Sequence, residues 1–589
     1  YTGVTTVAAG SLIIGGGGAI PDGSTLSIHD NATLDLAGYS DTVGALSGAG
    51  TIQLGSGGQL VMQIGEEVST FSGVITGDGG VEVSGNGIQV LSGANTYAGP
   101  TLINEGALTL GADGTLPSSG AVDIAGGMLD MHTYNNTVGA VTLRGGAKIY
   151  DYYSYYGYGG TLTAESFDVQ DGQIQAVISG GPLTKNDSGE EGGGTVEIDI
   201  PATYSGGTTV NAGKLALSTN WGFYNDMLPA GEDVTVNGGV LDLGGVTQSV
   251  GTLTLADGEI IDESGGGAIS ADAFDVRKGL ISANLEGDGA LVKTTDDNVT
   301  LTGNNSYTGG TTVSGGTLTG NGASLQGSIT NNALVVFDED DNREYVGSMS
   351  GSGSVIKANN GTITFSGANT YAGTTSIDSG TLILTGSSAS DMLVNDEGKL
   401  MGAGMTSGDL VVVGTVVPGT PGVNLGIGAL TVGDATFAGN GSLVVKFRDV
   451  SGVAGTGWDE IIVTGENGLD ITATSGSTFS VALVTLDASG NPGDCDGFDN
   501  TVSHSYNIVT TANGIAGFVA DKFSLYPAQF TNDLGGGYFT LGQSDKNMVL
   551  EFNAVPEPSA FALFMLAVPA VFAASRIRRK RSGSDLTKT

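Results

Sequence analysis

The sequence predicts an all-β protein: a right-handed parallel β-helix (solenoid) with a β-rich C-terminal cap and a short C-terminal transmembrane helix. Three observations carry this prediction: short alternating apolar runs, a repeat that spans most of the chain, and a biased composition. Glycine accounts for 103 of 589 residues, more than twice the usual share of roughly 7%. Charged residues make up 14%, against about 25% in ordinary domains.

The predicted strands are short, and their apolar residues alternate with polar ones, as around Leu34 and Leu36. Glycine or asparagine falls at each break, and this pattern is typical of strands joined by tight turns. Sandwiches and propellers also use such strands. A solenoid is favoured because the repeats are almost continuous, helical crossovers are absent, and small turn residues stack from coil to coil. Coils of roughly 20–25 residues would give about 17–21 coils in the repeat region.

Self-comparison finds four copies of one motif, of which "LSGANTYAGPTLINEGALTLG" from Leu91 is the most complete. Each copy contains a tyrosine, which we expect to pack at a corner of the solenoid. These tyrosines are Tyr97, Tyr204, Tyr307 and Tyr371. The first residues, "YTGVTTVAAG", match the motif from its tyrosine onward. We therefore expect the chain to be the C-terminal part of a longer precursor.

Three regions are predicted along the chain. Residues 1–424 form the solenoid, which is incomplete at its N-terminus, and residues 425–553 form the β-rich cap. A cap is needed because a bare solenoid end exposes apolar side chains and strand edges. Residues 554–589 form a C-terminal signal.

The charge and the cysteine content exclude several classes of protein. The net charge of −41 repels nucleic acid and anionic membranes, so we expect no nucleic-acid partner. One cysteine, Cys495, leaves no internal disulfide framework, and three scattered histidines make a histidine-based metal site improbable.

Two acidic stretches are weak candidates for calcium, because Ca²⁺ prefers clustered carboxylate and carbonyl oxygens on a turn. The candidate ligands are Asp338 and Asp340 in one stretch and Asp494 and Asp496 in the other. Neither stretch fits the twelve-residue calcium loop, and a solvated acidic turn is the favoured interpretation. No other cofactor or metal is expected.

The stretch "KIYDYYSYYGYGG", which begins at Lys148, is the best candidate for a specific ligand contact. Exposed tyrosines stack on sugar rings or mediate adhesion, because each presents apolar area with a polar tip. The alternative is a tyrosine-rich insertion that packs on its own solenoid, and we favour that alternative. The candidate contact residues are Tyr152, Tyr153, Tyr155 and Tyr156.

No catalytic residues are predicted. Carboxylates are so numerous that a pair of them carries no weight. The lysines that recur in the repeats stand singly and far apart, whereas a lyase site needs converging basic groups. They are Lys185, Lys293 and Lys357.

The C-terminal tail combines a 15-residue apolar run, residues 560–574, with a basic cluster directly after it. A helix of this length spans about 22 Å, which is short of a ~30 Å hydrocarbon core. The basic cluster marks the cytoplasmic side of a membrane. It consists of Arg576, Arg578, Arg579, Lys580 and Arg581.

Two resemblances follow from these motifs. The repeat, which is most specific at "SGANTYAG" (residues 92–99 and 366–373), resembles the autotransporter-associated β-strand repeat of bacterial surface proteins. The sequence Pro556, Glu557, Pro558, followed by the apolar run and the basic cluster, resembles the PEP-CTERM sorting signal of Gram-negative bacteria. The second resemblance implies export, an inner-membrane intermediate, and processing by an exosortase, a membrane cysteine transpeptidase.

These resemblances predict a non-enzymatic protein of the cell surface or extracellular matrix that acts as a structural spacer or adhesin. The implied partners are the exosortase, transiently the inner membrane, and exopolysaccharide or another surface matrix. The alternative is a carbohydrate-binding or carbohydrate-active β-helix that acts on the exopolysaccharide matrix.

Overall fold

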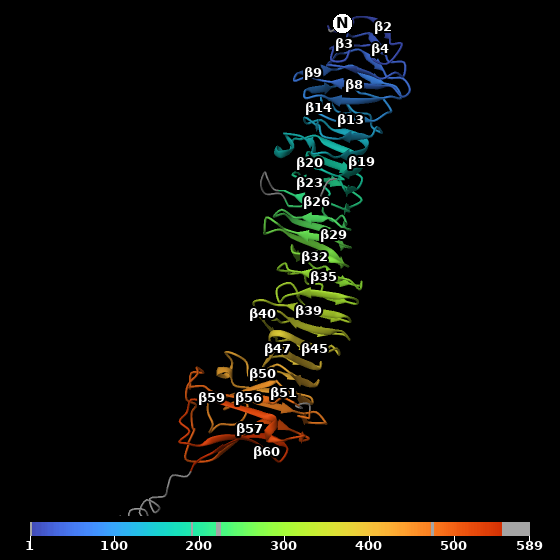
Figure 1. Ribbon diagram of the computed structural model, residues 1–589. Helices are drawn as coiled ribbons and strands as arrows, with labels where there is room; N and C mark the ends of the chain where they lie inside the picture. The colour runs from blue at the N-terminus through green and yellow to red at the C-terminus, as the bar shows by residue number, and fades with distance from the viewer. Residues whose placement is uncertain (1–2, 190–191, 219–224, 473–475, 556–589) are drawn as a thin grey trace, which may run out of the picture. The chain divides into compact units, whose positions relative to one another are not determined.

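The computed structural model describes residues 3–189, 192–218, 225–472 and 476–555. The chain divides into two compact units (Figure 1). The first comprises Tyr1–Asp338 and Gly347–Ser354, and the second comprises Glu339–Val346 and Val355–Thr589. The predicted sorting motif at Pro556–Pro558 and the basic cluster after residue 575 lie outside the described residues.

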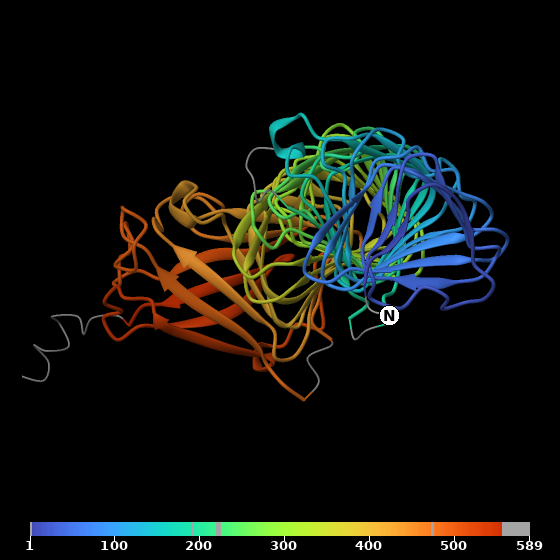
Figure 2. The same cartoon turned by 90° about the horizontal axis from the view of Figure 1, so that it is seen from above.

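The first unit is a stack of parallel strands that form the successive coils of a β-solenoid (Figures 1 and 2). One sheet runs through β1 (Thr5–Val7), β3 (Leu26–Ile28), β6 (Leu46–Gly48), β9 (Val68–Phe71), β12 (Ile88–Leu91), β14 (Ala107–Leu110), β16 (Met128–Asp130), β18 (Ala147–Tyr150), β20 (Gly172–Gln175), β23 (Thr195–Ile198), β26 (Lys214–Leu217), β28 (Val240–Asp242), β30 (Glu259–Ile261), β32 (Gly279–Ile281), β35 (Asn298–Leu301), β37 (Thr317–Gly320) and β39 (Leu334–Asp338).

A second parallel sheet of the first unit runs through β5 (Asp41–Val43), β8 (Gln59–Gln63), β11 (Gly80–Ser84), β13 (Thr101–Ile103), β15 (Val122–Ile124), β17 (Asn136–Leu143), β19 (Thr161–Val169), β22 (Leu183–Lys185), β25 (Thr208–Val210), β27 (Val234–Val236), β29 (Thr247–Leu255), β31 (Ala268–Val276), β34 (Ala290–Lys293), β36 (Thr311–Val313), β38 (Ile329–Asn331) and β41 (Met349–Ser350). Shorter strands complete some coils, for example β21 (Val177–Gly180) and β24 (Thr203–Tyr204).

The strand register gives the length of each coil. Within the first unit, the step from a residue to its partner in the next coil ranges from 16 residues (Phe167 to Leu183) to 26 residues (Lys214 to Val240). The described chain makes about 20 turns. The prediction of an all-β parallel solenoid is therefore confirmed.

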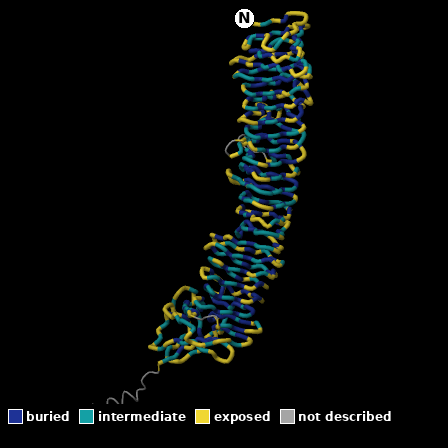
Figure 3. The backbone as a smooth tube through the Cα atoms, turned by 45° about the vertical axis from the view of Figure 1, so that its right-hand side comes forward, coloured by how far each residue is buried: buried dark blue, intermediate teal, exposed yellow. Residues whose placement is uncertain are grey.

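The interior of the first unit is apolar because alternate residues of each strand point inward. Leu26 pairs with Leu46 in the next coil, and both side chains are fully buried. Exposed residues gather along the edges of the stacked coils (Figure 3). Stacked turns leave no room for side chains: at Gly48, whose φ is +103°, a Cβ atom would lie 2.0 Å from the carbonyl oxygen of Ile28. This steric requirement accounts for much of the glycine in the sequence.

The second unit consists mainly of parallel strands, and its last described strands pair in antiparallel fashion. One run comprises β40 (Asn342–Tyr345), β43 (Thr362–Phe365), β45 (Thr375–Leu384), β47 (Met392–Gly402), β50 (Thr415–Pro418), β53 (Ser442–Phe447), β56 (Phe479–Thr485) and β59 (Phe523–Gln529). At the end of a second sheet, β61 (Asn547–Asn553) pairs antiparallel with β57 (His504–Thr511) and β60 (Tyr538–Ser544). The domain boundary at residue 425 stays a prediction.

Within the described residues, we find no helix that is long and apolar enough to cross a membrane. The predicted transmembrane helix, residues 560–574, falls outside that part of the chain.

Candidate functional site

Residues 151–160, here called the tyrosine loop, connect β18 to β19 and protrude from the outline of the coils (teal in Figure 2). The loop contains one 3-10 turn, η1 (Ser154–Tyr156), which ends at Gly157 in a left-handed conformation (φ 75°). The predicted contact tyrosines therefore stand on a loop, and they do not line one face of a strand. Their exposed fractions are 57% for Tyr152, 41% for Tyr153, 40% for Tyr155 and 54% for Tyr156.

Asp151 anchors the tyrosine loop, and its side chain is buried. Its Oδ1 accepts a hydrogen bond from the backbone N–H of Tyr153 at 2.8 Å. Its Oδ2 accepts from the N–H groups of Thr133 at 3.1 Å and Gly160 at 2.6 Å. One carboxylate thus ties the start of the loop to its end and to the turn of the preceding coil, because hydrogen bonds to a charged acceptor are strong.

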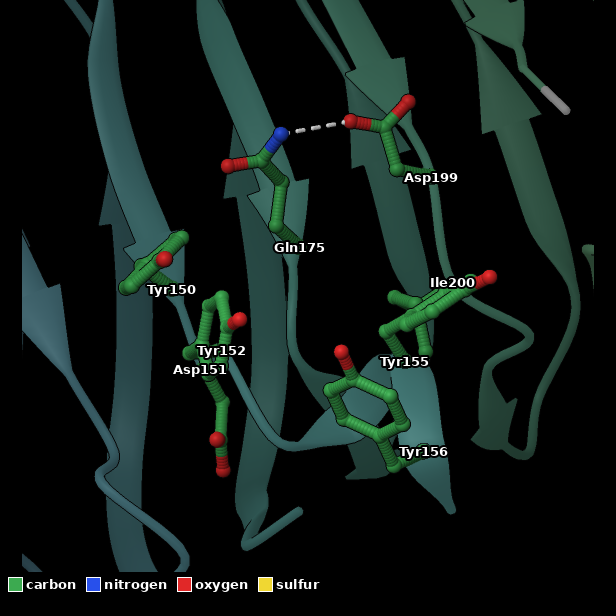
Figure 4. Close-up of a pocket in the computed structure, with 8 residues that line it drawn as sticks. All are labelled: Tyr150, Asp151, Tyr152, Tyr155, Tyr156, Gln175, Asp199 and Ile200. Carbon is green, nitrogen blue, oxygen red and sulfur yellow. Dashed lines mark hydrogen bonds between the residues drawn. The ribbon is translucent and has the colours of Figure 1, made fainter. Parts of the chain in front are cut away.

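The floor of the site is the outward face of β18, β20 and β23. Tyr150 pairs with Gln175 across β18 and β20, and their inward neighbours Ile149 and Ile174 are fully buried. Asp199 directly follows β23, and Gln175 Nε2 donates a hydrogen bond to Asp199 Oδ2 at 2.7 Å (Figure 4). Three successive coils therefore contribute one polar side chain each to a continuous row.

The loop and this row enclose a pocket of about 220 Å³, here called the tyrosine pocket (Figure 4). It is lined by Tyr150, Asp151, Tyr152, Tyr155, Tyr156, Gln175, Asp199 and Ile200. Three of the four predicted contact tyrosines thus face one pocket. The fourth, Tyr153, makes an edge-on contact with the His132 ring instead, at 6.2 Å between ring centroids. A ligand contact by any of the four stays a prediction.

The aromatic rings in the pocket hold one another in place. Tyr155 and Tyr156 meet edge to face, with centroids 4.9 Å apart, and the rings of Tyr152 and Tyr156 lie 6.0 Å apart. The hydrogen bond with Tyr152 raises the pKa of the Tyr156 hydroxyl. Burial raises the pKa of the Tyr150 hydroxyl, and the negative charge of Asp130 acts in the same direction. These hydroxyls therefore stay protonated and can donate hydrogen bonds at neutral pH.

The calcium candidates lie on exposed turns of the second unit, apart from Asp338, which ends β39 in the first unit. Near Asp340, Arg343 forms ion pairs with two neighbouring carboxylates. Its Nε lies 3.1 Å from Glu339 Oε1, and its Nη2 lies 2.9 Å from Asp341 Oδ2. Asp494 accepts a hydrogen bond from Thr531 Oγ1 at 2.7 Å, and Asp496 forms a parallel bridge with Asp449. No group of three or more His, Cys, Asp or Glu residues in the described chain could hold a metal ion. Calcium binding at either stretch stays a prediction.

The recurrent tyrosines of the repeat, here called the core tyrosines, are buried in the coils. In every copy the hydroxyl group bonds the threonine four residues further on. The oxygen–oxygen distances are 2.6 Å for Tyr97 and Thr101, 2.6 Å for Tyr204 and Thr208, 2.7 Å for Tyr307 and Thr311, and 2.5 Å for Tyr371 and Thr375.

The recurrent lysines are also buried in the coils and bond to the backbone. Lys185, Lys293 and Lys357 are fully buried. Lys185 Nζ donates to the carbonyl oxygens of Gly193 at 2.9 Å and Ala212 at 3.1 Å. Burial lowers the pKa of Lys185 and of Lys293. These ammonium groups bind backbone carbonyls of their own turn and of the next coil, and they converge on no common site.

Sequence reasoning missed the floor of the pocket, namely Gln175, Asp199 and Ile200. The signal was spacing: Gln175 follows Tyr150 by 25 residues and precedes Asp199 by 24. Each interval is one coil, but the intervals between partners vary along this chain, so spacing alone does not identify partners.

The fold and the site together define a class: a parallel β-solenoid with an exposed aromatic pocket on one face. The model of the passenger-associated-transport-repeat matches residues 81–110, 192–217, 291–319 and 355–388. Each match contains one core tyrosine.

Two curated proteins are similar over much of the chain. The adhesin BmaC autotransporter of Brucella suis biovar 1 is 28% identical over 401 residues, which is 66% of this chain and 9% of that protein. The probable autotransporter YfaL of Escherichia coli is 24% identical over 581 residues, which is 90% of this chain and 42% of that protein. The chain therefore spans less than half the length of either relative.

Among solved structures, the Haemophilus influenzae Hap adhesin aligns with 90% of this chain and 64% of its own, at 11% identity and a TM-score of 0.26. A superposition this poor supports no conclusion about fold or function.

Proposed function

We propose that this protein is a non-enzymatic adhesin or spacer on the surface of a Gram-negative bacterium. The observation that carries the proposal is the parallel solenoid, built from copies that match the passenger-associated-transport-repeat. Support also comes from the similarity to an autotransporter described as an adhesin. A solenoid suits this role because it presents a long surface on a stiff scaffold.

The polar groups of the interior support a structural role over a catalytic one. The buried lysines bond to backbone carbonyls, and the core tyrosines bond to neighbouring threonines. Neither set is among the lining residues of the tyrosine pocket, and the described part of that lining offers no nucleophile paired with a base. Fold alone assigns no activity, so the proposal rests on these particular contacts.

The test of this proposal is attachment by the native cells. We expect deletion of the gene to reduce attachment to a surface or to other cells, and complementation with the full-length gene to restore it. External protease should remove the protein from intact cells. Unchanged attachment together with complete protection from protease would contradict the proposal.

The sorting route is a further part of the proposal. The Pro556, Glu557, Pro558 motif with its basic tail would direct the protein through an inner-membrane intermediate to an exosortase. Intact mass spectrometry of the mature protein, with the exosortase gene present and deleted, tests this route. We expect the tail to be lost only when the gene is present, and a Glu557→Ala variant to keep its tail. A full-length protein in both strains would sink the sorting route and leave the adhesin proposal standing.

A second candidate function is carbohydrate binding, which the tyrosine pocket favours. Sugar rings stack on aromatic faces, and their hydroxyl groups need the hydrogen-bonding partners that Gln175 and Asp199 supply. We expect saturable binding to the exopolysaccharide of the host cell. Changing Tyr152, Tyr155 and Tyr156 to serine should abolish it. The matched control changes Tyr526 and Tyr538, exposed tyrosines of the second unit, to serine. Equal binding by both variants would refute this candidate.

A further inference from the structure

The tyrosine pocket combines an aromatic wall with a buried carboxylate, that of Asp199, and neither lysine nor arginine is among its described lining residues. We propose that it binds a cationic sugar unit, namely a hexosamine with a free amino group within a polysaccharide. This inference rests on the second candidate function and names its ligand class.

The aromatic wall suits such a ligand in two ways. The exposed faces of Tyr152, Tyr155 and Tyr156 give the apolar side of a sugar ring a surface to stack on. A tyrosine face also attracts a positive charge within about 6 Å of the ring centre. The rings that stack on the carbon skeleton of the sugar would therefore also attract its protonated amine.

The charged residues in the described lining of the pocket, Asp151 and Asp199, are both acidic. Asp199, which is only 1% exposed, lines the pocket and stays close to Gln175 through a 2.7 Å hydrogen bond. Asp130 pairs with Tyr150 across β16 and β18. The negative charge of Asp130 is felt at Tyr150, where it contributes to the raised pKa of the hydroxyl. Lys148 lies two residues before Tyr150 on the outward face of β18, but it is not part of the lining.

The hydrogen-bonding groups favour an amino sugar over a lysine side chain or a polyamine. Gln175 donates one of its two amide N–H groups to Asp199, and its amide oxygen points away from Asp199 (Figure 4). That oxygen and the tyrosine hydroxyls can bond to sugar hydroxyl groups. A lysine side chain has no hydroxyl groups, so it would contact only the carboxylate and the aromatic rings.

The experiment measures binding of three tetrasaccharides to the full chain by isothermal titration calorimetry: a glucosamine, an N-acetylglucosamine and a glucose oligomer of the same linkage. We expect the glucosamine oligomer to bind at least tenfold more tightly than the other two. Acetylation removes the positive charge and adds an acetyl group, and the glucose oligomer, which is neutral and lacks that group, separates the two effects without a variant of the protein. Added salt should weaken the glucosamine complex most, because screening acts on the charged ligand.

Two variants sharpen the test. Asp199→Asn keeps the size of the side chain and should bring the three affinities within about twofold of one another. The serine variant of Tyr152, Tyr155 and Tyr156 should lose binding of all three. Circular dichroism confirms the fold of each variant.

The outcomes separate the proposals. Equal binding of all three oligomers by the unmodified protein would overturn the cationic preference and leave carbohydrate binding standing. Binding of none would overturn both and leave the adhesin proposal untouched. Binding of tetralysine as tight as that of the glucosamine oligomer would overturn the sugar part of the inference.

Discussion

Tyrosine occupies two opposite environments in this protein. The core tyrosines are at most 2% exposed, and their hydroxyl groups form hydrogen bonds with the hydroxyl groups of threonines four residues further on. Those of the tyrosine loop are 40–79% exposed and touch mainly one another. The two groups share a residue type but not a role, because burial forces the hydroxyl of a core tyrosine to find an internal partner.

The core tyrosines and the tyrosines of the loop should therefore differ in what they contribute to the protein. Removing a core tyrosine should damage the coil that contains it, whereas removing a loop tyrosine should change only what the surface binds. Four predictions test this division.

Tyr204→Ala should cost roughly 3–5 kcal/mol of the free energy of unfolding, as for other large buried aromatic residues. The change opens a cavity beside Phe167, whose ring centroid lies 6.5 Å from that of Tyr204. Because repeat proteins unfold locally, we expect the loss as reduced hydrogen-exchange protection in β21, β24 and β25. Tyr155→Ala on the tyrosine loop is the matched control. Equal protection in both variants would break the comparison.

Alkaline pH should destabilise the protein through the core tyrosines. Burial raises the pKa of Tyr97 to about 12. The stability that depends on its neutral hydroxyl is complete below pH ~10, the pKa of tyrosine in an unfolded chain, and is lost as the pH rises through about 12. For Tyr97 the loss is roughly 2–3 kcal/mol. Denaturant melts from pH 9 to 12 should show a shallower decline for Tyr97→Phe than for the unmodified chain.

The hydroxyl group of a core tyrosine should contribute less to the free energy of unfolding than its aromatic ring. Tyr204→Phe leaves the buried Thr208 hydroxyl without its 2.6 Å partner and should cost about 1–2 kcal/mol. Combining it with Thr208→Val removes both polar groups and should cost less than the two single changes added together. A double-mutant cycle from denaturant melts measures this coupling. Additive costs would mean that the pair is not coupled.

Serine in place of Tyr152, Tyr155 and Tyr156 should alter the free energy of unfolding by less than ~0.5 kcal/mol per site, as for other exposed positions. Denaturant melts of the variant and the unmodified chain should nearly coincide. A loss comparable with that of Tyr204→Ala would mean that the loop packs as part of the coil.

Much of the fold could be predicted from the sequence, and the pocket only in part. Alternation and the recurring tyrosines indicate a solenoid, because both report local backbone geometry that repeats. The pocket depends on register: Tyr150, Gln175 and Asp199 meet only because the intervening turns have 25-residue and 24-residue spacings. Coil length in the first unit varies from 16 to 26 residues, and no local pattern near these three residues fixes it. Similarly, "KIYDYYSYYGYGG" identifies exposed aromatic residues, but only the contacts of Asp151 explain how they are held.

The assembly of the pocket from β18, β20 and β23 has a consequence for how such a chain can change over generations. All of its parts lie between residues 150 and 200, and each coil contacts chiefly its neighbours. Duplication or deletion of whole coils elsewhere would lengthen or shorten the protein without disturbing the pocket. A single-residue insertion within β20 would instead turn Gln175 toward the interior, because side chains alternate between faces. The pocket therefore tolerates changes in the number of coils elsewhere in the chain. It does not tolerate insertions that shift the strand register within its own coils.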